Sequence, residues 1–517
     1  MKLELRGITK RFPGVLANDD ISLKVGDGET LGLLGENGAG KTTLMNILYG
    51  LYQPDAGEIL IDDRPVRFSG PGDAIAAGIG MVHQHFMLVP VFTVAENVML
   101  GVESTRTALG MLDLPTVRRR IQEISERHNL KVDPDARVED LAVGVRQRVE
   151  IIKTLYRQSH VLVLDEPTAV LTPQEGEELF GIMRSLVAGG TSIIFITHKL
   201  GEVLEVADRI AVLRRGRVVG TTTPSETDSE KLATMMVGRA VDLVVDKTPA
   251  VPHEPILEIS GLRVRDDGGH LAVTDLDLTV HAGEIVAIAG VQGNGQSELA
   301  EAITGLRALE LGKILIGGHA IHLDPRSVYR EAVAHVPEDR LEEGLVPAFN
   351  VAENLALNSY WAPPFGHGLS LDRDEMVKVA EQRIKEFDIR TPSVFNPVGN
   401  LSGGNQQKVI VAREFSRPLK LLVAVQPTRG LDVGSIEYIH RRLVAKRDEG
   451  CAVLLISTEL DEVVALGDRI AVMFQGRIVS ELKPEEATFE KLGLLMGGAR
   501  PEERSVEEAV AMASQAQ

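Results

Sequence analysis

The sequence is nearly free of cysteine, which excludes a disulfide-stabilised fold. Cys451 is the single cysteine among 517 residues, so no internal disulfide can form. This usage suits a reducing compartment such as the cytoplasm. Cys451 begins the apolar run 451–456, where we expect a small core residue; a reactive thiol is the less favoured alternative.

Long apolar runs and targeting signals are also missing. No run approaches the ~18 residues that a membrane-spanning helix needs. The N-terminal residues lack a signal-peptide segment, and Lys2 excludes a myristoylation start. We therefore expect a protein that is soluble by itself, with any membrane role depending on a partner.

Positive charge is in deficit, with 55 Lys and Arg against 74 Asp and Glu and a net charge of −19. This balance disfavours a surface built mainly for nucleic acid, which is usually basic. The local run 118–120, all arginine, fits a solvated helix face better than a nucleic-acid contact.

The chain contains an internal repeat, with two copies of one sequence module. L-E-L-R-G-I at 3–8 returns as L-E-I-S-G-L at 257–262, and Gly57–Ile61 returns as Gly312–Ile316. In each copy strands alternate with helices, which predicts an α/β fold with a mainly parallel sheet. The helical period of 117–130 predicts a helical subdomain inserted into the first copy.

Residues 35–43 read G-E-N-G-A-G-K-T-T and match the phosphate-binding pattern G-x-x-x-x-G-K-[ST]. A strand over 29–34 and a helix over 43–51 are expected to flank them. Glycines let backbone N–H groups point at a polyphosphate, and the helix N-terminus adds positive potential. Lys41 would meet the outer phosphates, and Thr42 would offer a hydroxyl to Mg²⁺.

Two carboxylates follow the apolar run 160–164, namely Asp165 and Glu166. A carboxylate at the C-terminal end of a buried strand beside a phosphate loop suits a Mg²⁺ ligand, which indicates Asp165. Glu166 is placed to orient or deprotonate an attacking water.

Three further motifs make a resemblance to ABC-transporter ATPases specific. Residues 401–408, L-S-G-G-N-Q-Q-K, resemble their signature motif, His198 resembles their switch histidine, and Gln84 resembles their Q-loop glutamine. The likeness covers nearly the whole chain, and in each of the two copies the motifs follow the order that is expected of the family. It implies two tandem P-loop nucleotide-binding domains, 1–240 and 256–500, with a linker at 241–255 and a polar tail at 501–517.

The resemblance implies a role for each matching residue. Glu166 and His198 would be catalytic, with His198 forming a hydrogen bond to the γ-phosphate and fixing the attacking water. Thr42, Gln84 and Asp165 would hold Mg²⁺. Gln84 would also sense the transmembrane partner. The residues expected to bind ATP are Phe12, Gly35, Glu36, Asn37, Gly38, Ala39, Gly40, Lys41, Thr42, Thr43, Gln84, Ser402, Gly403 and Gly404. Phe12 would stack on adenine, although an ordinary role as a core phenylalanine is the alternative.

Domains of this family are expected to sandwich ATP head to tail, so that each site joins one phosphate loop to the other copy's signature. The first composite site keeps every group, including the D-loop residue Asp432. In the second site the matching positions hold Gln296, Val425, Gln426, Glu338, Glu459, Asp266 and Thr172, and the signature is reduced to L-A-V-G-V at 141–145. Valine cannot bind Mg²⁺ and glutamine cannot accept a proton, so one working and one inactive site are expected.

Tandem, unequal ATPases without membrane segments resemble the ATP-binding subunits of bacterial simple-sugar and nucleoside importers. The runs 143–151 and 426–432 look closest to the nucleoside branch, with a ribose-type sugar importer as runner-up; an exporter subunit and a soluble ribosome-associated ATPase are further alternatives. The resemblance implies ATP and Mg²⁺ as cofactors. It also implies two transmembrane permease subunits, an extracytoplasmic binding protein, no nucleic acid, and a place at the cytoplasmic face of the membrane.

Overall fold

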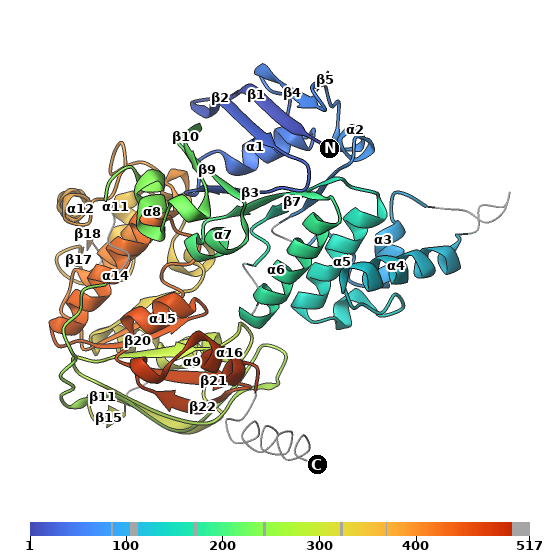
Figure 1. The fold of residues 1–517 in the computed structure, drawn as a ribbon. Helices are drawn as coiled ribbons and strands as arrows, with labels where there is room; N and C mark the ends of the chain where they lie inside the picture. Colours follow the sequence, from blue (N-terminus) through green and yellow to red (C-terminus); the bar gives the residue numbers. More distant parts are fainter. Residues whose placement is uncertain are drawn as a thin grey trace, which may run out of the picture. The chain divides into compact units, whose positions relative to one another are not determined.

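A computed structural model describes residues 1–83, 86–103, 112–168, 171, 173–240, 245–320, 324–368 and 370–498. The chain divides into two compact units, Met1–Val241 and Asp242–Gln517. In Figure 1 the first unit runs from blue to green and the second from green to red. Each unit is described by itself.

The centre of unit 1 is a six-stranded sheet in the order β10-β9-β3-β8-β7-β6. Five strands are parallel, and β10 pairs antiparallel with β9 at the edge. Every residue of β3, β7 and β8 is buried, as expected where helices cover both faces of a parallel sheet. The strands are β3 (Thr30–Gly35), β6 (Ile79–Val82), β7 (Val161–Asp165), β8 (Ser192–Thr197), β9 (Arg209–Arg214) and β10 (Arg217–Thr222).

A second, antiparallel sheet of unit 1 has the order β2-β1-β4-β5. Its strands are β1 (Leu3–Phe12), β2 (Val15–Val25), β4 (Ala56–Ile61) and β5 (Arg64–Val66). The buried side chains of β1 and β2 share one apolar core with helix α1 and with residues of the parallel sheet.

Some helices of unit 1 form a subdomain of their own. Three of them, α3, α4 and α5, lie between β6 and β7 in the chain and pack on one another, which confirms the inserted helical subdomain (Figure 1). The helices are α1 (Lys41–Leu48), α2 (Pro71–Ala76), α3 (Val94–Met99), α4 (Leu114–His128), η1 (Val138–Asp140), α5 (Val143–Tyr156), α6 (Pro173–Ala188), α7 (Leu200–Val206), η2 (Pro224–Glu226) and α8 (Ser229–Val237).

Unit 2 repeats this topology strand for strand. Its sheets have the orders β16-β19-β20-β13-β21-β22 and β12-β11-β14-β15, with a small hairpin, β17-β18, in addition. The strands are β11 (Pro255–Arg265), β12 (Leu271–His281), β13 (Ile285–Ala289), β14 (Leu311–Ile316), β15 (His319–Ala320), β16 (Val333–Val336), β17 (Gly366–His367), β18 (Ser370–Leu371), β19 (Leu421–Val425), β20 (Ala452–Ser457), β21 (Arg469–Phe474) and β22 (Arg477–Leu482). The predicted α/β class with two tandem copies is confirmed.

The helices of unit 2 cover its sheet as those of unit 1 do. They are α9 (Gln296–Ile303), α10 (Pro325–Arg330), η3 (Arg340–Gly344, a π-helical turn), α11 (Val351–Ala356), α12 (Arg373–Glu386), η4 (Val398–Asn400), α13 (Gly403–Phe415), α14 (Val433–Asp448), α15 (Leu460–Leu466), η5 (Pro484–Glu486) and α16 (Phe489–Met496). Cys451 precedes β20, and burial raises the pKa of its thiol to about 12. This is the environment of a core cysteine rather than a reactive one.

Both predicted bounds of the helix after the phosphate loop were wrong. The helix expected over 43–51 is α1, which begins at Lys41 and ends at Leu48. Gly40 is its N-cap in the left-handed conformation, so the backbone enters the helix directly from the last glycine of the loop.

The segment expected as a linker has no regular structure between 245 and 254 but is bound to unit 2. The Lys247 ammonium donates to the carbonyl oxygens of Leu466 and Gly467 at 2.8 and 2.7 Å and lies 3.2 Å from a carboxylate oxygen of Asp468. Arg447 donates to the carbonyl of Thr248 at 3.0 Å. The tail predicted over 501–517 lies outside the described residues.

Candidate active site

The phosphate loop of unit 1 connects the end of β3 to the start of α1. Asn37 and Gly38 are exposed, whereas Ala39 packs into the apolar core beneath them. Gly40 has φ 103°, and a Cβ atom there would lie 2.3 Å from the carbonyl oxygen of Ala17. Only glycine satisfies both conditions, so the loop keeps its curved backbone.

No side chain caps the N-terminus of α1. The first N–H groups of the helix therefore remain available to an anion, and the helix dipole favours negative charge at this end. Together with the curved loop, this is the geometry that a polyphosphate requires.

Lys41 is folded back over the loop. Its ammonium donates to the backbone carbonyls of Gly35 and Glu36, at 2.5 and 3.1 Å. Burial lowers its pKa, against the opposing charges of Glu166, Asp165 and Glu36. A desolvated ammonium that donates to two backbone carbonyls is well placed to exchange them for phosphate oxygens.

Asp165 ends β7 and is only 8% exposed. Burial, and then the adjacent charge of Glu166, raise its pKa to about 6, although Lys41 acts in the opposite direction. The exposed Thr42 stands at the start of α1. A carboxylate and a hydroxyl are the hard oxygen ligands that Mg²⁺ takes beside phosphates, so this donor pair fits a Mg²⁺–ATP site. Among the described residues, no cluster of three or more His, Cys, Asp or Glu could hold a metal by itself.

Glu166 follows Asp165 with φ 47°, a strained conformation for a residue with a side chain. Its N–H donates to the carbonyl of Ile196 at 2.9 Å, which ties the turn to β8. His198, just past β8, places Nδ1 3.1 Å from Glu166 Oε1. Burial acts to raise the pKa of Glu166, but the His198 hydrogen bond and the nearby positive charges outweigh it and lower the pKa. Glu166 is therefore held as a carboxylate.

A partly buried carboxylate that the sequence reasoning missed lies beside this pair. Glu202, on α7, accepts hydrogen bonds from the hydroxyls of Thr168 and Thr197 at 2.7 and 2.9 Å. It thereby joins the segments that follow β7 and β8. The internal repeat could have revealed Glu202, because Glu462 occupies the same place in unit 2. Glu462 accepts a hydrogen bond from Thr428 at 2.8 Å.

The signature motif of unit 2 begins α13, with Ser402 as N-cap and no side-chain cap bond. Ser402 is exposed, and its oxygen accepts a hydrogen bond from Asn405 at 2.9 Å. The open N–H groups of this helix form a second anion-accepting surface. A Cβ atom on Gly404 would collide with Ser435, at 2.3 Å, so the helix start lies tightly against α14. Asp432 caps that helix by accepting from the backbone and hydroxyl of Ser435.

The corresponding phosphate loop of unit 2 is filled by its own side chains. Gln296 donates to the carbonyl of Val291 at 3.0 Å, in the manner of Lys41 but without its charge. Glu338 accepts from the Ser297 hydroxyl at 3.1 Å and from Gln292 at 3.2 Å, and it pairs with Arg429. A carboxylate thus lies against the hydroxyl that would otherwise meet a metal ion.

The prediction that Glu459 takes the place of the switch histidine was wrong. Glu459 is the N-cap of α15, as Lys199 is of α7, so the residue matching His198 is Thr458. The backbone N–H and hydroxyl of Thr458 donate to Gln426 at 3.1 and 3.2 Å. Gln426 keeps the positive φ of its counterpart, 47°. Unit 2 therefore preserves the scaffold of the acid–histidine pair without its proton chemistry.

Phe12 ends β1 and is 36% exposed, with its ring edge-to-face on Tyr52 at 5.4 Å. The Lys10 ammonium lies 5.7 Å from the centroid of the same ring, and the stacking role of Phe12 stays a prediction. Gln84 and Thr172 lie outside the described residues.

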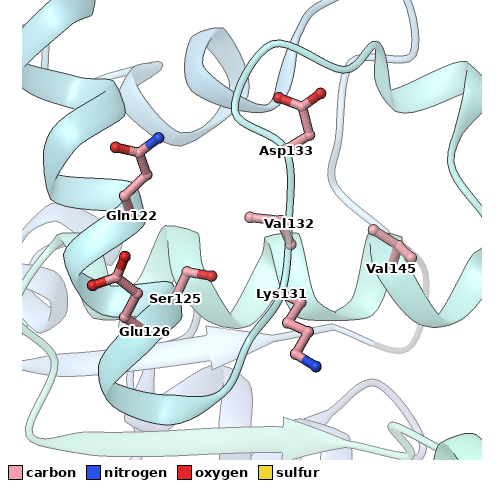
Figure 2. Close-up of a pocket in the computed structure, with 7 residues that line it drawn as sticks. All are labelled: Gln122, Ser125, Glu126, Lys131, Val132, Asp133 and Val145. Atoms are coloured by element: carbon pink, nitrogen blue, oxygen red, sulfur yellow. The ribbon is translucent and has the colours of Figure 1, made fainter.

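A separate hollow of about 520 Å³ lies on the helical subdomain of unit 1 (Figure 2). Gln122, Ser125 and Glu126 reach it from α4, residues 131–133 from the segment that follows, and Val145 from α5. None of the phosphate-loop residues lines it, so it is not part of the nucleotide site.

Comparison with known proteins gives consistent matches over both units. The family model described as "ABC transporter" matches residues 18–169 and 273–429. The guanosine import ATP-binding protein NupO of Bacillus subtilis is 50% identical over 97% of this chain and 98% of its own length. The nucleoside import ATP-binding protein NupA of Lactococcus lactis is 49% identical over 96% and 98%. The glucose import ATP-binding protein TsgD13 of Haloferax volcanii is 47% identical over 96% of each chain.

Proposed function

The chain belongs to the ABC transporter family, as its motifs predicted, and from this premise we propose that it is the ATP-hydrolysing subunit of a nucleoside importer. The observation that carries the assignment of activity is the convergence of Lys41, Asp165 and the Glu166–His198 pair around one phosphate loop. The nucleoside assignment is supported by the names of two relatives, each about half identical over nearly the whole chain.

In the proposed mechanism, the phosphate loop and Lys41 would hold the ATP phosphates, and Thr42, Gln84 and Asp165 would hold Mg²⁺, which would neutralise charge at the phosphates. Glu166 accepts a proton from the attacking water, and His198 keeps the carboxylate in place. Ser402, Gly403 and Gly404 would close the same site from unit 2. The second composite site would not hydrolyse ATP, because Val425 offers no ligand and Gln426 no base.

None of the helices in the described parts of the chain combines the length and the hydropathy of a membrane-spanning segment. The names of the import ATP-binding relatives support permease subunits as partners, which we propose to be two, together with an extracytoplasmic binding protein. The chain would be a peripheral protein of the cytoplasmic face. ATP binding would bring the two units together, and hydrolysis at the first site would reset them.

The experiment is affinity purification of the tagged full chain from gently solubilised membranes. Co-purification of hydrophobic permease chains is the expected result, and recovery of ribosomal proteins without a permease would refute the proposal. A matched control is the Glu166→Gln variant, which should capture the same partners because binding does not need turnover.

A sugar importer is the second candidate, because the glucose import relative is nearly as similar as the nucleoside ones. The two candidate functions differ in which solute should stimulate ATP hydrolysis by the assembled complex. In a complex reconstituted with its binding protein, nucleosides should stimulate ATP hydrolysis while glucose and ribose should not. Stimulation by a sugar alone would favour the second candidate.

A further inference from the structure

Glu338 joins the phosphate loop of unit 2 to the first turn of α9. It stands two residues after β16, and its two carboxylate oxygens bind different parts of the loop. Oε1 accepts a hydrogen bond from the Gln292 amide at 3.2 Å, and Oε2 accepts one from the Ser297 hydroxyl at 3.1 Å. A negatively charged side chain of the same unit therefore lies against the groups that would face a phosphate.

The Arg429 guanidinium keeps this carboxylate in place. Arg429 lies between β19 and α14, and its Nη1 donates to Glu338 Oε1. The side chain of Glu338 is 18% exposed, so the pair is partly shielded from water. A cation already on the carboxylate disfavours a second one there, because like charges at close range repel each other. Glu338 is therefore poorly suited to replace the missing Mg²⁺ ligand of unit 2.

Gln296 fills the space beneath the same loop. It is buried, and a Cβ atom on Gly290 would lie 2.3 Å from its Nε2. Nε2 donates to the carbonyl of Val291 at 3.0 Å, and Oε1 accepts the backbone N–H of Asn294 at 3.1 Å. The amide thus pairs with a donor and an acceptor of the loop, and it brings no positive charge with which a phosphate could form the stronger, charge-assisted hydrogen bonds.

The backbone of this loop keeps the curve of an anion site, so its side chains decide what it can bind. Gly295 is the N-cap of α9 with φ 100°, as Gly40 is of α1 with φ 103°. Unit 1 combines this backbone with the Lys41 ammonium, and its sequence has the neutral Gln84 two residues after β6, where unit 2 has Glu338. Unit 2 combines the same backbone with a neutral amide and a carboxylate.

We propose that Glu338 and Gln296 keep the phosphate loop of unit 2 free of nucleotide, so that the chain binds a single ATP, on unit 1. Glu338 is the specificity-determining residue. A phosphate group that approaches this loop meets a carboxylate in place of an ammonium, and it must displace that carboxylate from Ser297 and Gln292. Repulsion of a ligand by a like charge is one means of specificity. The proposal rests on ATP binding by unit 1, as proposed above.

The test counts the ATP molecules bound per chain. Equilibrium dialysis with radiolabelled ATP and Mg²⁺ is carried out on the full chain as Glu166→Gln, in which turnover is suppressed. This parent should bind one ATP, and adding Lys41→Ala should remove it. Two ATP on the parent, or one that persists with Lys41→Ala, would overturn the proposal. A parent that binds no ATP at all would instead refute the proposed function on which it rests.

Changing both side chains should open the second loop. In the same Glu166→Gln parent, Glu338→Ala together with Gln296→Lys should bind two ATP per chain. Gln296→Lys alone should bind one, because Glu338 still contacts Ser297. The matched control combines Gln296→Lys with Glu342→Ala, which removes an exposed carboxylate from the same segment and should also leave one. One ATP on the Glu338→Ala variant, or two on either of the others, would show that Glu338 does not close the loop.

Discussion

Glu166 and His198 are joined through Oε1 and Nδ1 at 3.1 Å, although 32 positions separate them in the chain. The parallel pairing of β7 with β8 brings them together, because each residue directly follows its strand. A base whose position depends on two adjacent strands loses little entropy when ATP binds.

Replacing Glu166 by glutamine keeps the size of the side chain and removes the proton acceptor. Turnover of ATP should fall by about 10²–10⁴-fold, while the affinity for ATP is largely retained. Phosphate release and equilibrium nucleotide binding measure the two quantities. Gln426→Ala, the matched change in unit 2, should leave turnover near that of the unaltered protein. Substantial hydrolysis by Glu166→Gln would contradict the assignment of one catalytic site.

The raised pKa of Asp165 predicts a pH-dependent stability without nucleotide and Mg²⁺. The folded protein holds this proton up to about pH 6, against the ordinary 3.8, so its contribution to stability is present below pH 3.8 and lost as pH rises through 6. Asp165→Asn should therefore stabilise the apoprotein at pH 7.5 by up to about 3 kcal/mol, while losing hydrolysis.

This gain in stability should shrink as the pH is lowered from 7 toward 4. Denaturant unfolding in EDTA, at a series of pH values, measures it for both proteins. Equal stability of the two proteins at pH 7.5 would show that burial of the Asp165 carboxylate does not destabilise the folded apoprotein.

Gln296→Lys restores the phosphate-loop lysine of unit 2 but should not create a second catalytic site. Val425 still provides no Mg²⁺ ligand, Gln426 no base, and Glu338 still lies on Ser297. The informative background is Glu166→Gln, in which any new hydrolysis must come from unit 2. Turnover above that of the Glu166→Gln parent would contradict the prediction.

Glu202 should support both stability and turnover. Glu202→Ala removes the acceptor for two buried threonine hydroxyls, at a cost of about 1–3 kcal/mol, and loosens the turn that holds His198. Glu462→Ala should cost a similar amount of stability in unit 2 while leaving turnover nearly unchanged. Thermal unfolding and steady-state hydrolysis separate the two effects. An equal loss of turnover in both variants would mean that the network acts on the fold alone.

The fold was largely predictable because apolar periodicity and the internal repeat both act over many residues. Strands predicted over 160–164 and 192–196 correspond to β7 and β8 within one residue. The start of α1 was missed because Gly40 serves both as the last loop residue and as the helix N-cap, which no periodic pattern reveals.

The candidate site was less predictable where long-range contacts decide it. Thr458 was missed because one position of register separates it from Glu459, and only the end of β20 determines which residue faces Gln426. The network of Glu338 with Ser297 and Arg429 joins residues up to 132 positions apart. Such contacts depend on tertiary packing, which local sequence does not encode.

The attachment of Lys247 to unit 2 shortens the tether between the two halves. Only residues 238–246 separate the end of α8 from this anchor. A tether this short keeps one half at an effective concentration on the order of millimolar relative to the other. If the halves pair as proposed, the rate of hydrolysis per chain should not change on dilution, because pairing within one chain does not depend on the protein concentration.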